Sequence, residues 1–217
     1  MSPTSSPADT KASASLAEQL QRLIDGLPAD GLALGALLDA VGEEGLLLLS
    51  LLLVLVFLIP VSIPGVSTVF GAAILMVGLS RLSGRPLWIP ARLKQRQLPS
   101  ERVRAGLSSG LVWVHRLERI SRPHRLPSLA DGRGIGLVNN LAFISAALLL
   151  MAPFGFVPFS NTLPALALLF YAVGLIQRDG LAILIGHVAQ LATVIYFGVL
   201  IGAGGLALGQ LWQKLSG

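Results

Sequence analysis

Cysteine is absent from the 217-residue sequence, and charged residues make up only 12% of it. The first absence excludes disulfides, thiolate nucleophiles and cysteine metal ligands, and it leaves the redox compartment open. The second sets the chain apart from soluble domains, in which about 25% of residues are charged. Three stretches, residues 45–80, 134–177 and 180–213, contain no charged side chain. Soluble folding does not require such stretches, so the sequence predicts an all-α integral membrane protein.

The charges that are present are unevenly distributed. Twelve of the sixteen Lys and Arg residues lie between Arg81 and Arg133, where only three acidic residues accompany them. Cytoplasmic loops of membrane proteins carry such an excess of positive charge. We therefore expect a multi-pass protein whose basic segment, residues 83–133, is cytoplasmic and faces the anionic head groups of the lipid bilayer. No nucleic-acid partner is expected for a chain this apolar.

Two short polar breaks interrupt the apolar sequence. The first, residues 60–68, contains Pro60, Pro64 and Gly65, which cannot continue a helix. The second break, residues 153–162, has the same character. The two breaks align so that Pro64 matches Pro158, Ser67 matches Asn161 and Thr68 matches Thr162. This pattern predicts an internal repeat of two short-helix hairpins, each with a proline-bracketed polar tip.

The hairpins fall within a simple expected order. Residues 1–14 are rich in Ser, Thr, Pro and Ala and are expected to be disordered. Residues 15–217 are expected to form a single membrane domain. Its parts are amphipathic helices over 15–44, broken near Pro28 and Gly31, the first hairpin over 45–82, the basic segment over 83–134, the second hairpin over 135–178 and a C-terminal transmembrane segment over 180–213.

The apolar helices of the hairpins are short. Each has 14 to 16 residues, which corresponds to about 21–24 Å of helix. The hydrocarbon core of a bilayer is about 30 Å thick. Two arrangements therefore remain open: the turns complete the crossing, or the hairpins are re-entrant and meet near the midplane.

The basic segment contains one further helix. Ser100 and Glu101 are typical of a helix start, and Pro123 ends the helix shortly after Ser121. An apolar stripe recurs at helical spacing along it, formed by Val103, Leu107, Leu111, Val114 and Leu117. Basic side chains occupy the remaining positions, so this stretch predicts an amphipathic interfacial helix held against anionic head groups.

The hairpin tips carry the main candidate functional residues. These are Pro64, Ser67, Thr68, Pro158, Asn161 and Thr162. Irregular backbone at membrane depth is tolerated where protein or water covers it, so the polar tips are expected to approach each other and form a shared centre. The competing interpretation is that the four polar side chains cap the returning helices, because Ser, Thr and Asn are favoured capping residues.

Secondary candidates lie further along the chain. Arg178 and Asp179 form either an ion pair at a site or a polar turn before Gly180. His187 and Gln190 are rare residues for a membrane helix and are expected to face the bundle interior, as part of a site or as a packing contact. Gly pairs four residues apart, at positions 198 and 202 and at 205 and 209, suit close helix contact or a homodimer.

Motifs for catalysis are not convincing. The sequence Gly106-Leu107-Ser108-Ser109-Gly110 lacks the strand–turn–helix context of a hydrolase elbow. His115 and His124 do not have a metal-ligand spacing on one helix. We therefore expect no catalytic residue, no metal, no cofactor and no enzyme activity.

An ordered set of motifs carries a resemblance to a known family. The motifs are residues 60–68 with Gly71, residues 84–90 with Trp88, residues 158–165 and residues 178–180. Together they resemble the ExoD family of bacterial exopolysaccharide-synthesis proteins, over roughly residues 30–205. The resemblance implies a protein of the bacterial inner membrane that is linked to exopolysaccharide production and, in some bacteria, to alkaline tolerance. It implies no catalytic residue.

Two classes of function remain after this comparison. The first is a non-enzymatic accessory role in exopolysaccharide synthesis or export, acting through the synthesis machinery or lipid-linked intermediates. The second is a small proton, cation or solute transporter linked to alkaline tolerance. Broken hairpins with polar tips favour transport. The lack of an acidic residue inside the apolar stretches disfavours it, because proton and cation pathways usually contain one.

Overall fold

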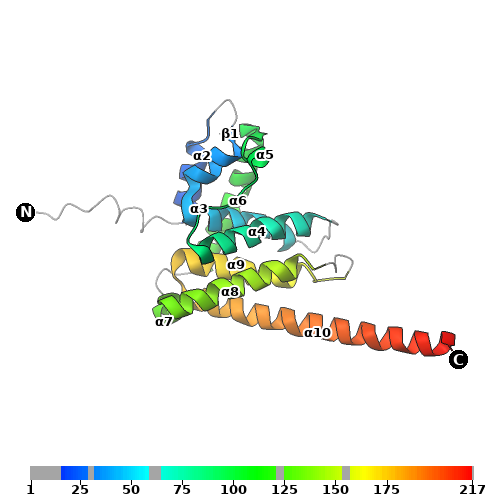
Figure 1. Cartoon of the computed structure of the whole chain (residues 1–217). Coiled ribbons are helices and arrows are strands. Elements are labelled where there is room, and N and C mark those ends of the chain that lie inside the picture. The colour runs from blue at the N-terminus through cyan, green and yellow to red at the C-terminus, as the bar shows by residue number, and fades with distance from the viewer. Residues whose placement is uncertain (1–15, 29–31, 59–64, 121–124, 153–156, 217) are drawn as a thin grey trace, which may run out of the picture.

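A computed structural model describes residues 16–28, 32–58, 65–120, 125–152 and 157–216, and it is almost entirely helical (Figure 1). The elements in chain order are α2 (Leu16–Asp25), β1 (Leu32–Ala33), α3 (Leu34–Leu55), the short 3-10 helix η1 (Val56–Leu58), α4 (Val66–Ser83), α5 (Ala91–Lys94), β2 (Gln97–Leu98), α6 (Ser100–Ile120), α7 (Pro127–Ala130), α8 (Arg133–Leu150), α9 (Thr162–Gln177) and α10 (Gly180–Ser216). The predicted all-α class is confirmed. Residues 1–14, expected to be disordered, lie outside the described residues.

The amphipathic helices predicted near the N-terminus and in the basic segment pack on each other. Helix α2 buries Leu20 and Ile24, and α6 buries Leu107 and Val114. A two-residue antiparallel ladder, β1 with β2, ties the start of α3 to the segment before α6. The apolar stripe of α6 therefore lies mainly against α2, while its basic positions Arg102, Arg104 and Arg116 are exposed.

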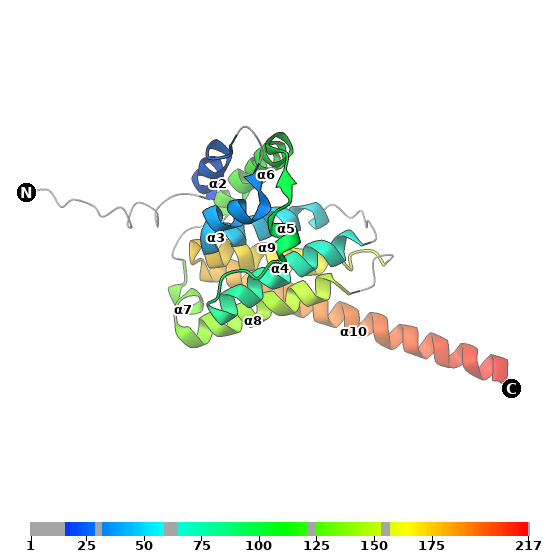
Figure 2. The ribbon, with the colours of Figure 1, turned by 45° about the horizontal axis from the view of Figure 1, so that its top comes forward.

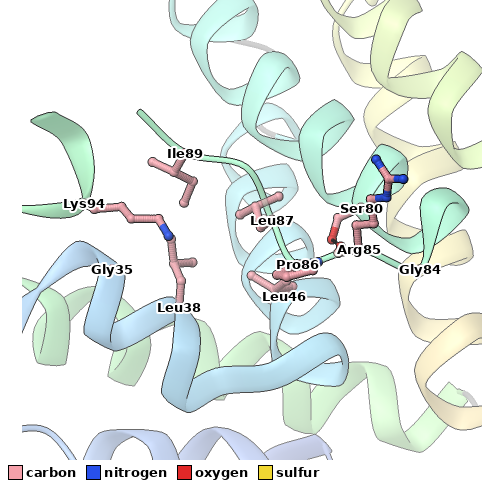
Figure 3. Close-up of a pocket in the computed structure, with 10 residues that line it drawn as sticks. All are labelled: Gly35, Leu38, Leu46, Ser80, Gly84, Arg85, Pro86, Leu87, Ile89 and Lys94. Atoms are coloured by element: carbon pink, nitrogen blue, oxygen red, sulfur yellow. Dashed lines mark hydrogen bonds between the residues drawn. The ribbon is translucent and has the colours of Figure 1, made fainter. Parts of the chain in front are cut away.

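Helix α3 differs from the sequence expectation. The expected division at residues 44 and 45, between an amphipathic helix and the first hairpin, lies inside one continuous helix. Glu43 and Glu44 are good helix formers, so a change from polar to apolar sequence does not by itself end a helix. The ribbon of α3 bends between Leu38 and Leu46 (Figure 3), where Gly42 and Gly45 weaken the helix.

Four helices form the centre of the molecule. Helix α4 packs against α3 and α8, and α9 packs against α8 and α3. The first residues of α4 and of α9 lie at the same end of this bundle in both views (Figures 1 and 2). Helix α9 is the most enclosed, because α10 covers it as well, and its buried side chains include Leu168, Tyr171 and Val173.

Small residues let these helices approach closely. A Cβ atom added to Gly78 of α4 would lie 2.7 Å from Cγ1 of Ile144 in α8, well inside normal carbon contact. One added to Gly186 of α10 would lie 2.8 Å from the Tyr171 ring of α9. Such contacts between small residues and large neighbours are typical of helix packing in membranes.

Within the described part of the chain, three helices are long and apolar enough to cross a membrane: Val66–Ser83, Arg133–Leu150 and the Gly180–Gly205 part of α10. The apolar stretches Gly45–Leu58 and Thr162–Gln177 are shorter. Helix α10 has 37 residues, about 56 Å, and its distal half extends beyond the other helices (Figure 1). Phe197 is the last buried residue along it among those described.

Candidate functional site

The first hairpin tip is described only from Gly65 onward, so Pro64 lies outside the described residues. Gly65 occupies the position before α4 with φ of 85°, a left-handed conformation that glycine adopts readily. Ser67 lies in the first turn of α4 and is buried, whereas Thr68 is exposed. Only one of the two polar side chains is therefore turned toward the protein interior.

The second tip carries its polar residues further inside. Pro158 is exposed, and Phe159 adopts a φ of 64°, which is unusual for a residue with a side chain. Asn161 is buried and Thr162 is half-buried. The hydroxyl of Tyr196 in α10 donates a hydrogen bond to the carbonyl of Pro158, so α10 touches this tip directly.

The described N-cap residues of the two returning helices, Gly65 for α4 and Asn161 for α9, make no side-chain capping hydrogen bond. Ser67 and Thr68 lie inside α4 rather than before it. Whether the four polar tip residues cap the returning helices or line a shared centre stays a prediction. The two tips lie at the same end of the bundle (Figures 1 and 2).

A second group of polar residues lies between α8, α9 and α10, and it contains the predicted His187. Nδ1 of His187 lies 2.9 Å from Oη of Tyr171 in α9. Its Nε2 lies 3.1 Å from Oδ1 of Asn139 in α8. Nδ2 of Asn139 in turn donates to the carbonyl of Leu129 in α7, at 2.9 Å. One imidazole thus links three helices of the bundle.

These contacts determine the proton positions on the imidazole. The amide of Asn139 donates through Nδ2 to a carbonyl, so its Oδ1 faces His187 as an acceptor. Nε2 of His187 must therefore carry a proton. In the neutral ring, Nδ1 then accepts the hydrogen bond of the Tyr171 hydroxyl. If the ring gains a second proton, the same hydroxyl can accept instead, so the contact does not depend on one charge state.

Predicted Gln190 lies one turn beyond His187 and makes a similar contact. Its Nε2 donates to Oγ of Ser145 in α8 at 2.9 Å, and Ser145 donates to the carbonyl of Ala142. Asn140 of α8 donates to the carbonyl of Gly78 in α4 at 3.2 Å. The side-chain oxygens of Gln190 and Asn140 are buried without a hydrogen-bond partner among the described residues. Buried oxygens of this kind retain the capacity to bind a donor.

Arg178 and Asp179 join α9 to α10. Arg178 ends α9 with φ of 51°, a left-handed conformation. Oδ1 of buried Asp179 accepts hydrogen bonds from the backbone amides of Leu181 and Ala182, at 3.0 and 3.3 Å. A carboxylate at the start of a helix stabilises it through these bonds and through the helix dipole. The structure thus gives Asp179 a capping function, and it places Gly180 against the carbonyl of Leu126.

The candidate residues therefore form two groups rather than one. The tip residues Asn161 and Thr162 lie at one end of α9, while His187 and Gln190 lie along α10. Tyr196, nine residues beyond His187, connects α10 to the second tip. Sequence reasoning missed Asn139, Tyr171 and Ser145. The adjacent amides of Asn139 and Asn140 inside a charge-free stretch were an available signal.

Comparison with known proteins gives a consistent result. The family described as "Exopolysaccharide synthesis, ExoD" matches residues 16–199. Protein ExoD of Rhizobium meliloti (strain 1021) is 43% identical over 196 residues, which cover 90% of this chain and 81% of that protein. An uncharacterized protein of Synechocystis sp. is 32% identical over 124 residues, 57% of each chain. No solved structure matches the chain.

Proposed function

Because the chain belongs to the ExoD family of exopolysaccharide synthesis proteins, we propose that it acts in the bacterial inner membrane as a non-enzymatic accessory of exopolysaccharide synthesis or export. The family relationship over residues 16–199 is the observation that carries this proposal. Three helices of membrane-spanning length support the location. In this proposal the protein contacts the synthesis machinery or lipid-linked intermediates, and its activity comes from binding rather than from bond cleavage.

We further propose that the bundle is built from two related hairpins, α3 with α4 and α8 with α9. The contact pattern supports this. If each helix of the first hairpin is exchanged with its counterpart in the second, α3 with α8 and α4 with α9, the contact of α4 with α8 becomes the contact of α9 with α3, and both contacts are present. Both tips then face the same side of the membrane. The basic segment and the turn at Arg178 face the cytoplasm, in accordance with the distribution of positive charge.

The short apolar helices need not cross the membrane alone. Helix α9 is enclosed by α3, α8 and α10, so its own surface is covered largely by protein rather than by lipid. This enclosure is compatible with hairpins that are re-entrant and with hairpins whose turns complete the crossing. In both arrangements the polar residues of the tips, with buried Ser67 and Asn161, form the functional centre.

The direct test is genetic complementation. A strain that lacks the gene is supplied with the wild-type chain or with variants, and exopolysaccharide yield is measured while membrane protein level is checked by immunoblot. The proposal expects reduced yield in the deletion strain and full recovery with the wild-type chain. An unchanged yield in the deletion strain would contradict it.

A second candidate function is transport of protons or cations, and one observation favours it. The hydrogen-bonded series Tyr171–His187–Asn139 lies inside three apolar helices, and imidazole is the side chain best suited to exchange protons near neutral pH. Purified protein in proteoliposomes with a pH-sensitive dye tests this function. Flux that is present in the wild type and absent in His187→Gln would favour transport over the accessory role.

A further inference from the structure

We propose that a cavity at the C-terminal end of α4 binds the phosphate head group of a membrane lipid. The cavity has a volume of about 300 Å³ and lies between α3, the end of α4, the linker that follows α4, and α5 (Figure 3). This inference rests on the proposed membrane location of α4. It does not depend on the role in exopolysaccharide synthesis.

The lining of the cavity combines apolar side chains with positive charge. Leu38, Leu46, Leu87 and Ile89 provide apolar surface, and the lining residues that the structure describes include no Asp or Glu. Lys94 extends its side chain across the cavity toward Leu38 (Figure 3). An amphiphilic anion, with a charged head and a hydrocarbon chain, matches this combination better than a soluble anion does.

The positive charges at the cavity have no described counter-charge. Neither Lys94 nor Arg85 forms an ion pair within the described part of the chain. Arg85 lies at the rim, and its guanidinium is directed along α4 (Figure 3). Because the Arg85 side chain is exposed, it can turn toward a bound phosphate. Lys94 is the principal phosphate contact in this proposal, and Arg85 is the second.

The backbone around the cavity is held in place by several hydrogen bonds. Gly84 ends α4 with φ of 62°, and the amide of Arg85 donates to the carbonyl of Ser80. Oγ of Ser80 donates to the carbonyl of Arg85 at 2.6 Å. These bonds fix the direction in which the chain leaves α4, so the cavity wall does not depend on the ligand.

Lys94 is positioned from the opposite wall. The amide of Leu34 donates to the carbonyl of Arg96 at 3.1 Å, which holds the segment after α5 against the start of α3. A Cβ atom added to Gly35 would lie 3.2 Å from Cβ of Lys94, so the glycine allows the lysine stem to lie directly over α3. The stem of the lysine is thereby positioned at the cavity, while the residue as a whole stays exposed to solvent.

The depth of the cavity suits a lipid head group. Helix α4 is of membrane-spanning length, and the cavity lies where its apolar sequence gives way to the basic segment. Trp88 beside the cavity is 77% exposed, and tryptophan favours the membrane interface. Basic pockets on the cytoplasmic side of membrane helices commonly bind phospholipid head groups.

Native mass spectrometry of the full chain tests the proposal. The protein is released from detergent after incubation with phosphatidylglycerol, with phosphatidylcholine, with undecaprenyl phosphate, or with inorganic phosphate alone. Lys94→Gln and Arg85→Gln remove the proposed contacts. Arg92→Gln is the matched control, because Arg92 is exposed on the same helix as Lys94 and does not line the cavity.

The expected result is retention of phosphatidylglycerol, undecaprenyl phosphate or both, in preference to the zwitterionic lipid. Lys94→Gln should lower retention about fivefold, the effect of one charge near a membrane surface, and Arg92→Gln should not change it. A preference for one of the two anionic lipids supports the site and identifies which lipid supplies the bound phosphate group. Equal losses in Lys94→Gln and Arg92→Gln would overturn the proposal, since they indicate nonspecific attraction. The proposal would also be overturned if the protein retained inorganic phosphate but neither anionic lipid, or if Lys94→Gln left lipid retention unchanged.

A photoactivatable phosphatidylglycerol provides a second measurement in native membranes. Cross-linked peptides should come from residues 84–94, and cross-links confined to other segments would contradict the site. Membrane fractionation in the same preparation separates the two proposals. Protein in the membrane fraction without cross-links at the cavity contradicts only this inference, whereas protein absent from that fraction contradicts the proposed location.

Discussion

Oη of Tyr171 lies 2.9 Å from Nδ1 of His187, and the two rings meet edge to face with their centroids 5.1 Å apart. The tyrosine belongs to the most enclosed helix, α9, and the histidine belongs to the longest, α10. Gly186 provides the space for this contact, because it presents no Cβ to the Tyr171 ring. The interface between α9 and α10 therefore contains a polar contact that is specific in both shape and hydrogen bonding.

Replacing Tyr171 by Phe should lower the free energy of unfolding by about 1 kcal/mol, because Nδ1 of His187 loses its only described partner. Thermal unfolding in detergent measures this change. Tyr196→Phe is the control, because its hydroxyl contacts a carbonyl at the exposed tip. A larger loss in Tyr196→Phe than in Tyr171→Phe would show that the interior contact is not the more important one.

Replacing Gly186 by Ala should destabilise the bundle by about 1–3 kcal/mol, since the new methyl group would overlap the buried Tyr171 ring. Gly198→Ala on the same helix is the matched control. Its Cβ would meet no atom within 4 Å, so stability should be unchanged or slightly raised. Equal melting temperatures for the two variants would indicate that α9 and α10 are not packed as described.

Replacing Asn161 by Asp should reduce exopolysaccharide yield in a complemented deletion strain. Asn161 is buried and makes no side-chain capping hydrogen bond, so the aspartate would place a charge at an interior position that is neutral in the wild type. Asn161→Ser keeps a small neutral polar group and should complement. Gln213→Glu makes the same amide-to-acid change at an exposed position of α10 and should also complement. Full yield with Asn161→Asp at normal membrane level would contradict a functional centre at the tips.

Topology can be tested with single cysteines, because the chain contains none. A cysteine at exposed Arg96 should be protected from an impermeant thiol reagent added from the periplasm, since the basic segment is proposed to be cytoplasmic. A cysteine at Gln213, beyond the spanning part of α10, should be labelled. The opposite labelling pattern would reverse the proposed orientation.

Much of the secondary structure could be predicted from the sequence, because helix formation depends on local features. The start of α6 at Ser100 agrees with the helix-start residue types there, although Oγ of Ser100 has no described hydrogen-bond partner, and the helical residues 180–213 agree with their apolar composition. The continuity of α3 could not be predicted in this way. Its apolar half begins at an acidic pair, and whether a helix continues through such a pair depends on the packing of both halves.

The polar cluster shows a different limit of sequence reasoning. His187 and Gln190 were identifiable, because such residues are rare in apolar helices. Their partners Asn139 and Ser145 were not, because pairing depends on how α8 and α10 are rotated about their axes. A single sequence gives the periodicity of each helix and no information on relative rotation. The role of Asp179 as a cap likewise depended on the turn geometry at Arg178.

The distal half of α10 can transmit a mechanical force to the bundle, because it extends beyond the helices on which the first half packs. Among the described residues, the last buried side chain along α10 is that of Phe197, and the helix continues beyond the bundle to Ser216. Because α10 is packed on the bundle as far as Phe197, a tilt of its distal part pivots near that residue. A tilt of about 10° there would move Ser216, 19 residues away, by roughly 5 Å, given about 1.5 Å of rise per residue. Tyr196 lies at the pivot, so a lateral force on the distal helix would act first on its hydrogen bond to the carbonyl of Pro158, while His187 stays within the packed part.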